Sequence, residues 1–175
     1  SIFIANCSKV LKLKAAIDQI SVYTDGSCNT IQGIGAWTAI VFQGPEKKVL
    51  SDHAFNTTHQ RMELTAVINA VIYLKQNNLA SKQIIIYTDS QYVSGLALRK
   101  EKLIATNFIT SKNKVLPNAD LISRLLEASE NLQLTIIKVK SHQKGSYHEK
   151  LNGEADKLCR KIVRQLVERS NFTNS

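Results

Sequence analysis

The chain has 175 residues, of which 43% are hydrophobic and 21% charged, as in one soluble globular domain with its own core. Its formal net charge of +9 favours a polyanionic partner, with nucleic acid as the leading candidate. No run approaches the roughly eighteen apolar residues of a membrane span. The three cysteines are far apart in the sequence, which argues against a disulfide framework or a zinc cluster and favours a reducing compartment. We therefore expect no secretory leader, no membrane partner and a cytoplasmic, intracellular location.

The first 19 residues mix apolar side chains with lysines and carry no capping signal. We treat residues 1–19 as an N-terminal appendage whose structure the sequence does not define. A single domain is then expected over residues 20–170, followed by a short tail at 171–175.

Three runs of β-branched and aromatic residues open this domain. The first ends at Asp25, the second spans 33–42, and the third spans 48–57 after a turn at 43–47. Because short turns join them, we expect an antiparallel meander.

The hydrophobic period changes after Thr57-Thr58, which indicates a helix over 59–76. A strand ending at Asp89 follows, so strand, helix and strand form a parallel crossover unit. Further along, the pattern predicts helices at 90–98, 121–129 and 153–168, a strand at 132–140 and a polar loop at 141–152. The last helix has a basic exposed side formed by Lys157, Arg160, Lys161 and Arg164. The resulting fold class is α/β.

Two of the β runs end in the same tripeptide, Tyr-Thr-Asp, at Asp25 and Asp89. An isolated buried carboxylate is costly, so two such strand ends suggest carboxylates brought together at one sheet edge. Glu63 lies one turn into the crossover helix, and Asp156 is expected to open the final helix. Four acids at one edge repel each other unless divalent cations lie between them, and oxygen ligands suit Mg²⁺ or Mn²⁺.

These motifs resemble those of type 1 ribonuclease H. The resemblance covers residues 20–168 and rests on five segments in the family's order: Thr24-Asp25-Gly26-Ser27-Cys28, Arg61-Met62-Glu63-Leu64, Thr88-Asp89-Ser90-Gln91-Tyr92, Val139-Lys140-Ser141-His142 and Asn152-Gly153-Glu154-Ala155-Asp156. It implies a ribonuclease H-like fold, with a five-stranded mixed sheet of an antiparallel meander plus parallel strands, flanked by helices.

The resemblance also implies an activity: endonucleolytic hydrolysis of the RNA strand of RNA–DNA hybrids by a two-metal-ion mechanism. The expected products carry 5′-phosphate and 3′-hydroxyl ends. Two Mg²⁺ ions per site in the substrate complex, with Mn²⁺ as a substitute, would be held by the carboxylates of Asp25, Glu63, Asp89 and Asp156.

A histidine in the polar loop completes the implied catalytic set. His142 matches the family residue that assists proton transfer or product release, and His148 in the same loop could substitute for it. His53 and His59 have no claim as ligands.

Substrate contacts are implied for a further group of residues. Cys28, Gln60 and Gln91 match positions around the 2′-hydroxyl, the group that distinguishes RNA from DNA. Thr58 and Asn118 resemble a pocket for a DNA phosphate. His59, where the family often has Asn, and Ile31-Gln32, where it has polar and proline residues, depart from the family pattern.

A basic stretch at 99–114 falls where some family members carry a protrusion that grips the hybrid. Lys100, Lys102, Lys112 and Lys114 are its candidate substrate-binding side chains, against the alternative of a solvated charged face. The tryptophans often present in such protrusions are missing here.

Two other functions fit the same motifs. One is a catalytically silent domain that only binds nucleic acid or a partner, although all four acids argue against it. The other is a recombinase or exonuclease of the same fold. The sequence also leaves open a free-standing and monomeric enzyme, which we favour, or the ribonuclease domain of a reverse transcriptase carried in a virion.

Overall fold

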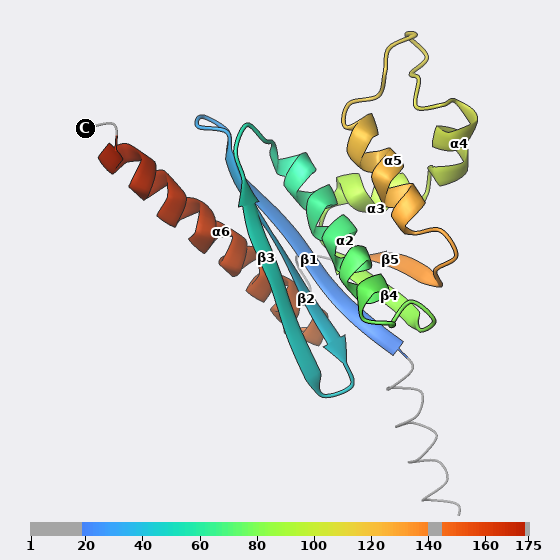
Figure 1. The fold of residues 1–175 in the computed structure, drawn as a ribbon, viewed down its shortest axis with the longest axis horizontal. Coiled ribbons are helices and arrows are strands. Elements are labelled where there is room, and N and C mark those ends of the chain that lie inside the picture. Colours follow the sequence, from blue (N-terminus) through green and yellow to red (C-terminus); the bar gives the residue numbers. More distant parts are fainter. Residues whose placement is uncertain (1–18, 140–144, 174–175) are drawn as a thin grey trace, which may run out of the picture.

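Strand β1 (Gln19–Asn29) is the centre of a five-stranded mixed sheet. The structure is a computed structural model that describes residues 19–139 and 145–173. Beside β1 lie β2 (Ile34–Gln43) and β3 (Glu46–Ala54) on one side, and β4 (Gln83–Thr88) and β5 (Leu134–Lys138) on the other, in the order β3-β2-β1-β4-β5 (Figure 1). The first three strands pair antiparallel, whereas β1, β4 and β5 run parallel. The expected meander plus parallel strands is confirmed.

Asp25 lies inside β1, so the expectation that it ends the strand is wrong. Gly26 and Ser27, which have the character of turn residues, stay in the strand because β2 pairs with them. The parallel pairing of β1 with β4 stops earlier, at Tyr23 opposite Tyr87. Asp25 therefore stands just past the point where the two parallel strands part.

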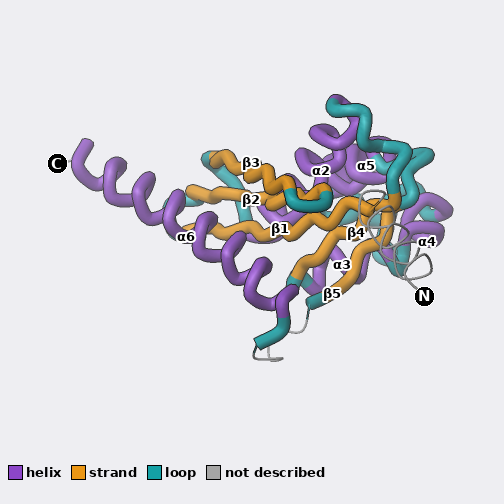
Figure 2. The backbone as a smooth tube through the Cα atoms, turned by 90° about the horizontal axis from the view of Figure 1, so that it is seen from below, coloured by secondary structure: helices purple, strands orange, loops and turns teal. Residues whose placement is uncertain are grey.

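The described residues form five helices: α2 (His59–Gln76), α3 (Gln91–Ala97), α4 (Lys100–Ala105), α5 (Ala119–Ala128) and α6 (Tyr147–Thr173). Helices α2 and α5 lie on one side of the sheet and α6 on the other (Figure 2). In the described part of the chain, no helix is long and apolar enough to cross a membrane.

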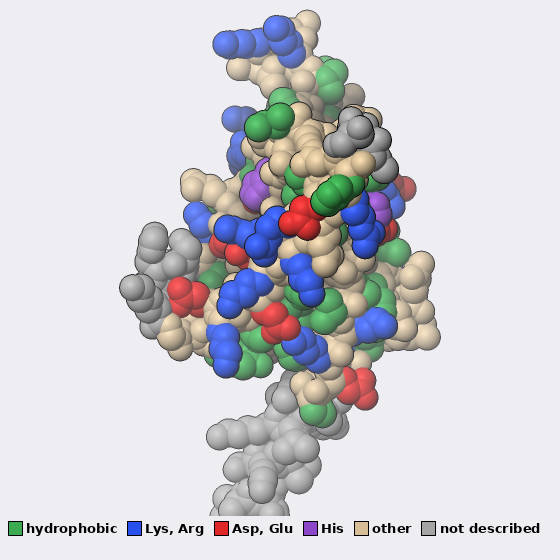
Figure 3. All heavy atoms as spheres, turned by 90° about the vertical axis from the view of Figure 1, so that its left-hand side faces the viewer, with side chains coloured by type: hydrophobic (Ala, Val, Ile, Leu, Met, Phe, Trp, Pro, Cys, Tyr) green, Lys and Arg blue, Asp and Glu red, His purple; other side chains and the backbone are tan. Residues whose placement is uncertain are grey.

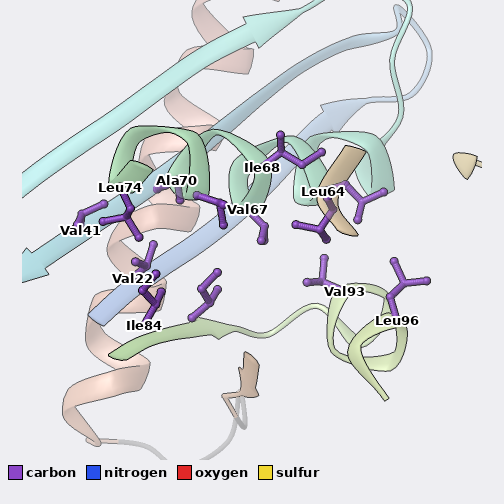
Figure 4. Close-up of a cluster of buried hydrophobic side chains, with 14 of the residues drawn as sticks. Val22, Val41, Leu64, Val67, Ile68, Ala70, Leu74, Ile84, Val93 and Leu96 are labelled. Atoms are coloured by element: carbon purple, nitrogen blue, oxygen red, sulfur yellow. The ribbon is translucent and has the colours of Figure 1, made fainter. Parts of the chain in front are cut away.

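The larger hydrophobic core lies between the sheet and α2. Val22 and Ile84 point from β1 and β4 towards Leu64 and Val67 of α2, and Val93 joins them from α3 (Figure 4). Burial of each such side chain contributes about 1.5–3 kcal/mol. Because strand side chains alternate, Tyr23 faces the opposite side and packs in a second cluster with Leu151 and Ala155 of α6.

Helix α2 rests directly on the backbone of β1 at Gly26. A Cβ atom on Gly26 would lie 2.3 Å from the backbone nitrogen of Glu63 and 2.5 Å from the carbonyl carbon of Met62. No side chain fits between the strand and the first turns of the helix. This contact fixes the position of the Glu63 backbone relative to Asp25, the residue before Gly26.

Helix α6 is longer than expected, 27 residues in place of the expected 153–168. It begins at Tyr147 because Leu151 and Asn152, assigned to a loop, are buried against the sheet. Asp156 therefore lies in the third turn and does not open the helix. The helix also runs through the expected domain boundary at 170 and takes in part of the expected tail. The expected appendage lies outside the described residues, except for Gln19 in β1.

Candidate active site

Four elements bring the four predicted carboxylates to the region where β1 and β4 part. Asp25 is 7% exposed on β1 and Glu63 is 8% exposed on α2. Asp89 follows β4 directly and is exposed, whereas Asp156 on α6 is partly buried. The charges of Asp89 and Asp156 both act on Asp25.

Burial and neighbouring negative charges both oppose ionisation of the Asp25 carboxyl group. Burial raises its carboxyl pKa to about 7, and the negative charges of Asp89 and Asp156 contribute to the increase. Its Oδ2 is buried and has no hydrogen-bond partner. The thiol of Cys159 donates to the backbone oxygen of Asp25 at 3.3 Å. Such a carboxylate is stabilised either by a proton or by a nearby cation.

Glu63 has both of its oxygens engaged. Ser90 donates its hydroxyl to Glu63 Oε2 at 2.6 Å, and His59 Nε2 lies 3.1 Å from Glu63 Oε1. The hydrogen bond to Glu63 raises the pKa of His59, and the negative charges of Asp25 and Asp89 contribute to the increase. His59 is thus next to the carboxylates, a position that sequence reasoning missed although the His59–Glu63 spacing of one helical turn could have indicated it.

The fourth carboxylate, Asp156, pairs with a cation from its own helix. Arg160 Nε donates to Asp156 Oδ1 at 2.6 Å, one turn further along α6. This pair raises the pKa of Arg160, with the Asp156 hydrogen bond as the largest cause.

The donor set fits a hard divalent cation in its chemistry. All four groups are carboxylates, and Oδ2 of Asp25 is buried with no hydrogen-bond partner. As the side chains stand, however, no three His, Cys, Asp or Glu residues within 19–139 and 145–173 are gathered closely enough to hold an ion. In this arrangement Glu63 and Asp156 are each held by a protein partner, Ser90 and Arg160 respectively.

The two histidines proposed for catalysis have different outcomes. His142 lies outside the described residues, so its role stays a prediction. His148 does not lie in a loop: it is in the first turn of α6, where its ring stacks on Tyr87 with centroids 4.2 Å apart. The Tyr23 hydroxyl donates to its Nδ1 at 2.8 Å, given the tautomer that leaves this nitrogen free. Those contacts make His148 an anchor of α6 and give no support to its role as a substitute for His142.

The predicted phosphate-pocket residues lie together at the entry of α2. Thr58 is the N-cap of α2 and its side chain accepts from Arg61 N. Asn118, in the left-handed conformation with φ 61°, caps α5 and accepts from Arg61 Nη1 at 3.4 Å. Arg61 also makes a two-pronged contact with Asp120, at 3.0 and 2.7 Å. Arg61 thus joins the two predicted residues, a role the sequence did not indicate.

The residues predicted near the 2′-hydroxyl lie on three elements. Cys28, on β1, donates its thiol to the backbone oxygen of Thr57 at 3.5 Å. Gln60 is exposed in the first turn of α2. Gln91, the first residue of α3, accepts from Lys138 Nζ at 3.3 Å. Cys28 and Gln60 lie on the same elements as Asp25 and Glu63. Gln91 follows Asp89 closely in the chain.

The predicted basic protrusion is formed by α4 and the turn after it. Lys100 and Lys102 are exposed on α4. Lys112 and Lys114 are exposed on a tight turn closed by an antiparallel bridge between Ile109 and Val115. The four lysines therefore extend from the side of the domain that α3 and α5 form.

The sheet order, the crossover unit and the carboxylate edge define a ribonuclease H-like α/β domain. Residues 18–164 match the RNase H family. The chain belongs to this family and is a ribonuclease H enzyme.

Individual relatives agree with this assignment. The ribonuclease H of a Thermoanaerobacter species is 34% identical over 161 residues, which cover 90% of this chain and 96% of the relative. That of Chlorobium luteolum is 33% identical over 150 residues, or 84% and 97% of the two chains. The solution structure of the PFV RNase H domain has a TM-score of 0.68 at 26% identity, and covers 83% of this chain and 94% of that one. A type 1 RNase H with the type 2 active-site motif shares the fold, with a TM-score of 0.71 at 19% identity over 84% of this chain and 72% of that one.

Proposed function

We propose that this ribonuclease H cleaves the RNA strand of RNA–DNA hybrids internally, by a two-metal-ion mechanism that leaves 5′-phosphate and 3′-hydroxyl ends. The observation that carries the proposal is the buried Asp25 carboxylate, whose Oδ2 has no hydrogen-bond partner and on which the charges of Asp89 and Asp156 act. Family membership supplies the substrate class. The four carboxylates supply the chemistry that such a reaction needs.

Asp25, Glu63, Asp89 and Asp156 would hold two Mg²⁺ ions, or Mn²⁺ in their place. When bound, such a pair activates a water, holds the scissile phosphate and stabilises the leaving 3′-oxygen. Asp25 is the candidate shared ligand, because it projects from the central strand between elements that carry the others.

The surrounding residues would orient these carboxylates. Ser90 fixes one oxygen of Glu63, and the contact of α2 with Gly26 fixes the backbone of Glu63. Arg160 holds one oxygen of Asp156 and would compete with a cation for it. His142 is proposed to assist proton transfer or product release.

Recognition of the hybrid would rest on two groups of residues. Cys28, Gln60 and Gln91 border the carboxylates and are proposed to sense the 2′-hydroxyl. Thr58 and Asn118, linked through Arg61, are proposed to bind a phosphate of the DNA strand. We further propose a monomeric, cytoplasmic enzyme.

The direct test is cleavage of an end-labelled RNA–DNA hybrid with Mg²⁺ or Mn²⁺, with product ends identified by phosphatase and ligase treatment. We expect internal cuts in the RNA strand that leave 5′-phosphates. DNA duplex and RNA duplex are the substrate controls. Efficient cutting of DNA duplex would favour a recombinase or exonuclease, and folded protein without activity at any metal concentration would contradict the proposal.

The matched variants for this test are Asp25→Asn and Asp89→Asn. Each should abolish cleavage, because an amide removes the negative charge that a cation needs, while hybrid binding stays largely intact. Substantial residual cleavage in either variant would overturn the assigned roles.

A further inference from the structure

Helix α6 carries basic side chains on the face turned away from the sheet. Its buried residues, which include Leu151, Ala155 and Cys159, pack on the sheet. At about 100° per residue, four exposed basic residues fall within about 60° of one another on the opposite side of the helix. These residues form the α6 basic stripe: Lys150, Lys157, Lys161 and Arg164. At about 1.5 Å of rise per residue, the stripe is about 21 Å long.

The acids of α6 leave this stripe positively charged. Glu154 lies about 20° outside this arc and pairs with Lys47 of β3, so its charge is balanced from the sheet. Glu168 lies on the arc, but one turn beyond Arg164, where the stripe ends. Asp156 pairs with Arg160 beside the stripe. In Figure 3, which faces this side of the molecule, Lys and Arg side chains spread across the surface with fewer acids between them. The stripe is therefore a positive surface separate from the lysines of the α4 protrusion.

We propose that the α6 basic stripe binds the phosphate backbone of a nucleic acid duplex that extends beyond the carboxylates. A duplex is a regular polyanion with about 3.4 Å per base pair, so a stripe about 21 Å long spans about six base pairs. The α6 helix also projects past the end of the sheet (Figures 1 and 2). The inference rests on the proposed function only in taking nucleic acid as the ligand class.

A membrane surface is a poorer match for the same charges. A helix that binds the bilayer interface inserts its apolar face among the headgroups. In α6 the apolar side chains Leu151, Ala155 and Val163 are buried within the domain. Two aromatic side chains of α6, Tyr147 and Phe172, are exposed, but they lie at opposite ends of the helix and do not form the continuous apolar face that such binding requires.

The test uses the full chain with Lys150→Gln, Lys157→Gln and Lys161→Gln combined. Arg164 is left unchanged because it also lines a groove with Ser27 and Asn29 of β1. The control combines Lys48→Gln, Lys75→Gln and Lys82→Gln, which removes the same charge elsewhere. Fluorescence anisotropy in EDTA measures binding to hybrids of about 8 and about 24 base pairs over a range of salt concentrations.

The stripe variant should bind the long hybrid on the order of tenfold more weakly, and the slope of log K against log salt should fall by up to about 2.7. Affinity for the short hybrid, and its cleavage with Mg²⁺, should match the wild type and the control. Equal affinities and slopes for variant and control on the long hybrid would overturn the inference. Binding to vesicles of anionic phospholipid is measured in parallel. A stripe variant that loses binding to these vesicles but not to the long hybrid would also overturn the inference. If the wild type does not cleave the hybrid, the proposed function fails, whereas a wild type that cleaves and a variant that binds normally refute only the role of the stripe.

Discussion

Ser90 donates its hydroxyl to Glu63 Oε2 at 2.6 Å, joining the start of α3 to α2. The hydroxyl oxygen of Ser90 also accepts a hydrogen bond from the backbone nitrogen of Val93 at 3.1 Å and so caps α3. One side chain therefore both orients a candidate ligand and ends the strand-to-helix connection that carries Asp89.

These two roles can be separated with Ser90→Ala and Ser90→Gly. Both variants lose the bond to Glu63, so kcat should fall roughly tenfold in each. Alanine should also cost about 1 kcal/mol of stability through the lost cap, whereas glycine costs only a few tenths. Steady-state kinetics and urea unfolding measure the two effects. A variant with normal kcat would show that Ser90 serves only as a cap.

The metal-free protein should lose stability as the pH rises from about 4 to about 7. Asp25 has an ordinary carboxyl pKa of 3.8 and a folded-state pKa of about 7, so in this range the folded state holds a proton that the unfolded state has released. Stability is thus fully present below the lower value and declines through the upper one. Thermal unfolding in EDTA at a series of pH values measures this decline.

Asp25→Asn is the control for that pH series. It should remove most of the dependence and leave the part due to His59, whose pKa is raised by its hydrogen bond to Glu63. Mg²⁺ should stabilise the wild type at pH 8 more than the variant, because it binds the folded state. A wild-type profile as flat as that of the variant would contradict the state assigned to Asp25.

Gly26→Ala should destabilise the fold by about 3 kcal/mol, because the new methyl group meets the backbone of α2. Gly153→Ala is the contrasting variant. A Cβ there has open space within α6, so it should gain roughly 0.5–1 kcal/mol from helix propensity. Denaturant unfolding should rank the two on opposite sides of the wild type. Equal stabilities would mean that α2 can move off β1.

The α4 protrusion gives a fourth prediction. Replacing Lys100, Lys102, Lys112 and Lys114 by glutamine should weaken hybrid binding, and the salt slope should fall by up to about 3.6 if each contacts one phosphate. Anisotropy titrations at several salt concentrations test this. Unchanged affinity at low salt would show that the four lysines form a solvated face.

Capping residues and hydrophobic period predicted the bounds of some elements closely. They failed where contacts with other elements determine where a helix or strand begins or ends. The helix from His59 to Gln76 was expected at its observed bounds, because Thr58 is a good N-cap and the apolar period is regular. The start of α6 was missed because residues 147–152 are mostly polar, and the burial of Leu151 and Asn152 against the sheet is not visible in the local pattern. The extension of β1 past Asp25 likewise depends on pairing with β2.

The carboxylates could be predicted as a set, but their present partners could not. Two runs that end in Tyr-Thr-Asp indicate one sheet edge for Asp25 and Asp89. In the structure Asp25 lies within β1 and Asp89 follows β4, and the charge of Asp89 acts on Asp25. The contacts of Glu63 with Ser90 and His59 depend on side-chain geometry between helices. The exact spacing of groups across elements is not encoded in local pattern.

The contact at Gly26 has a consequence for how the chain can change. Since helix and strand touch there through backbone atoms, their separation does not depend on the size of any side chain. Core residues such as Val67 or Ile84 can be exchanged for others of similar volume, and the layers can adjust elsewhere. Such exchanges should leave the separation of the Asp25 and Glu63 backbones unchanged. Core residues can therefore vary without moving these two carboxylate-bearing residues apart.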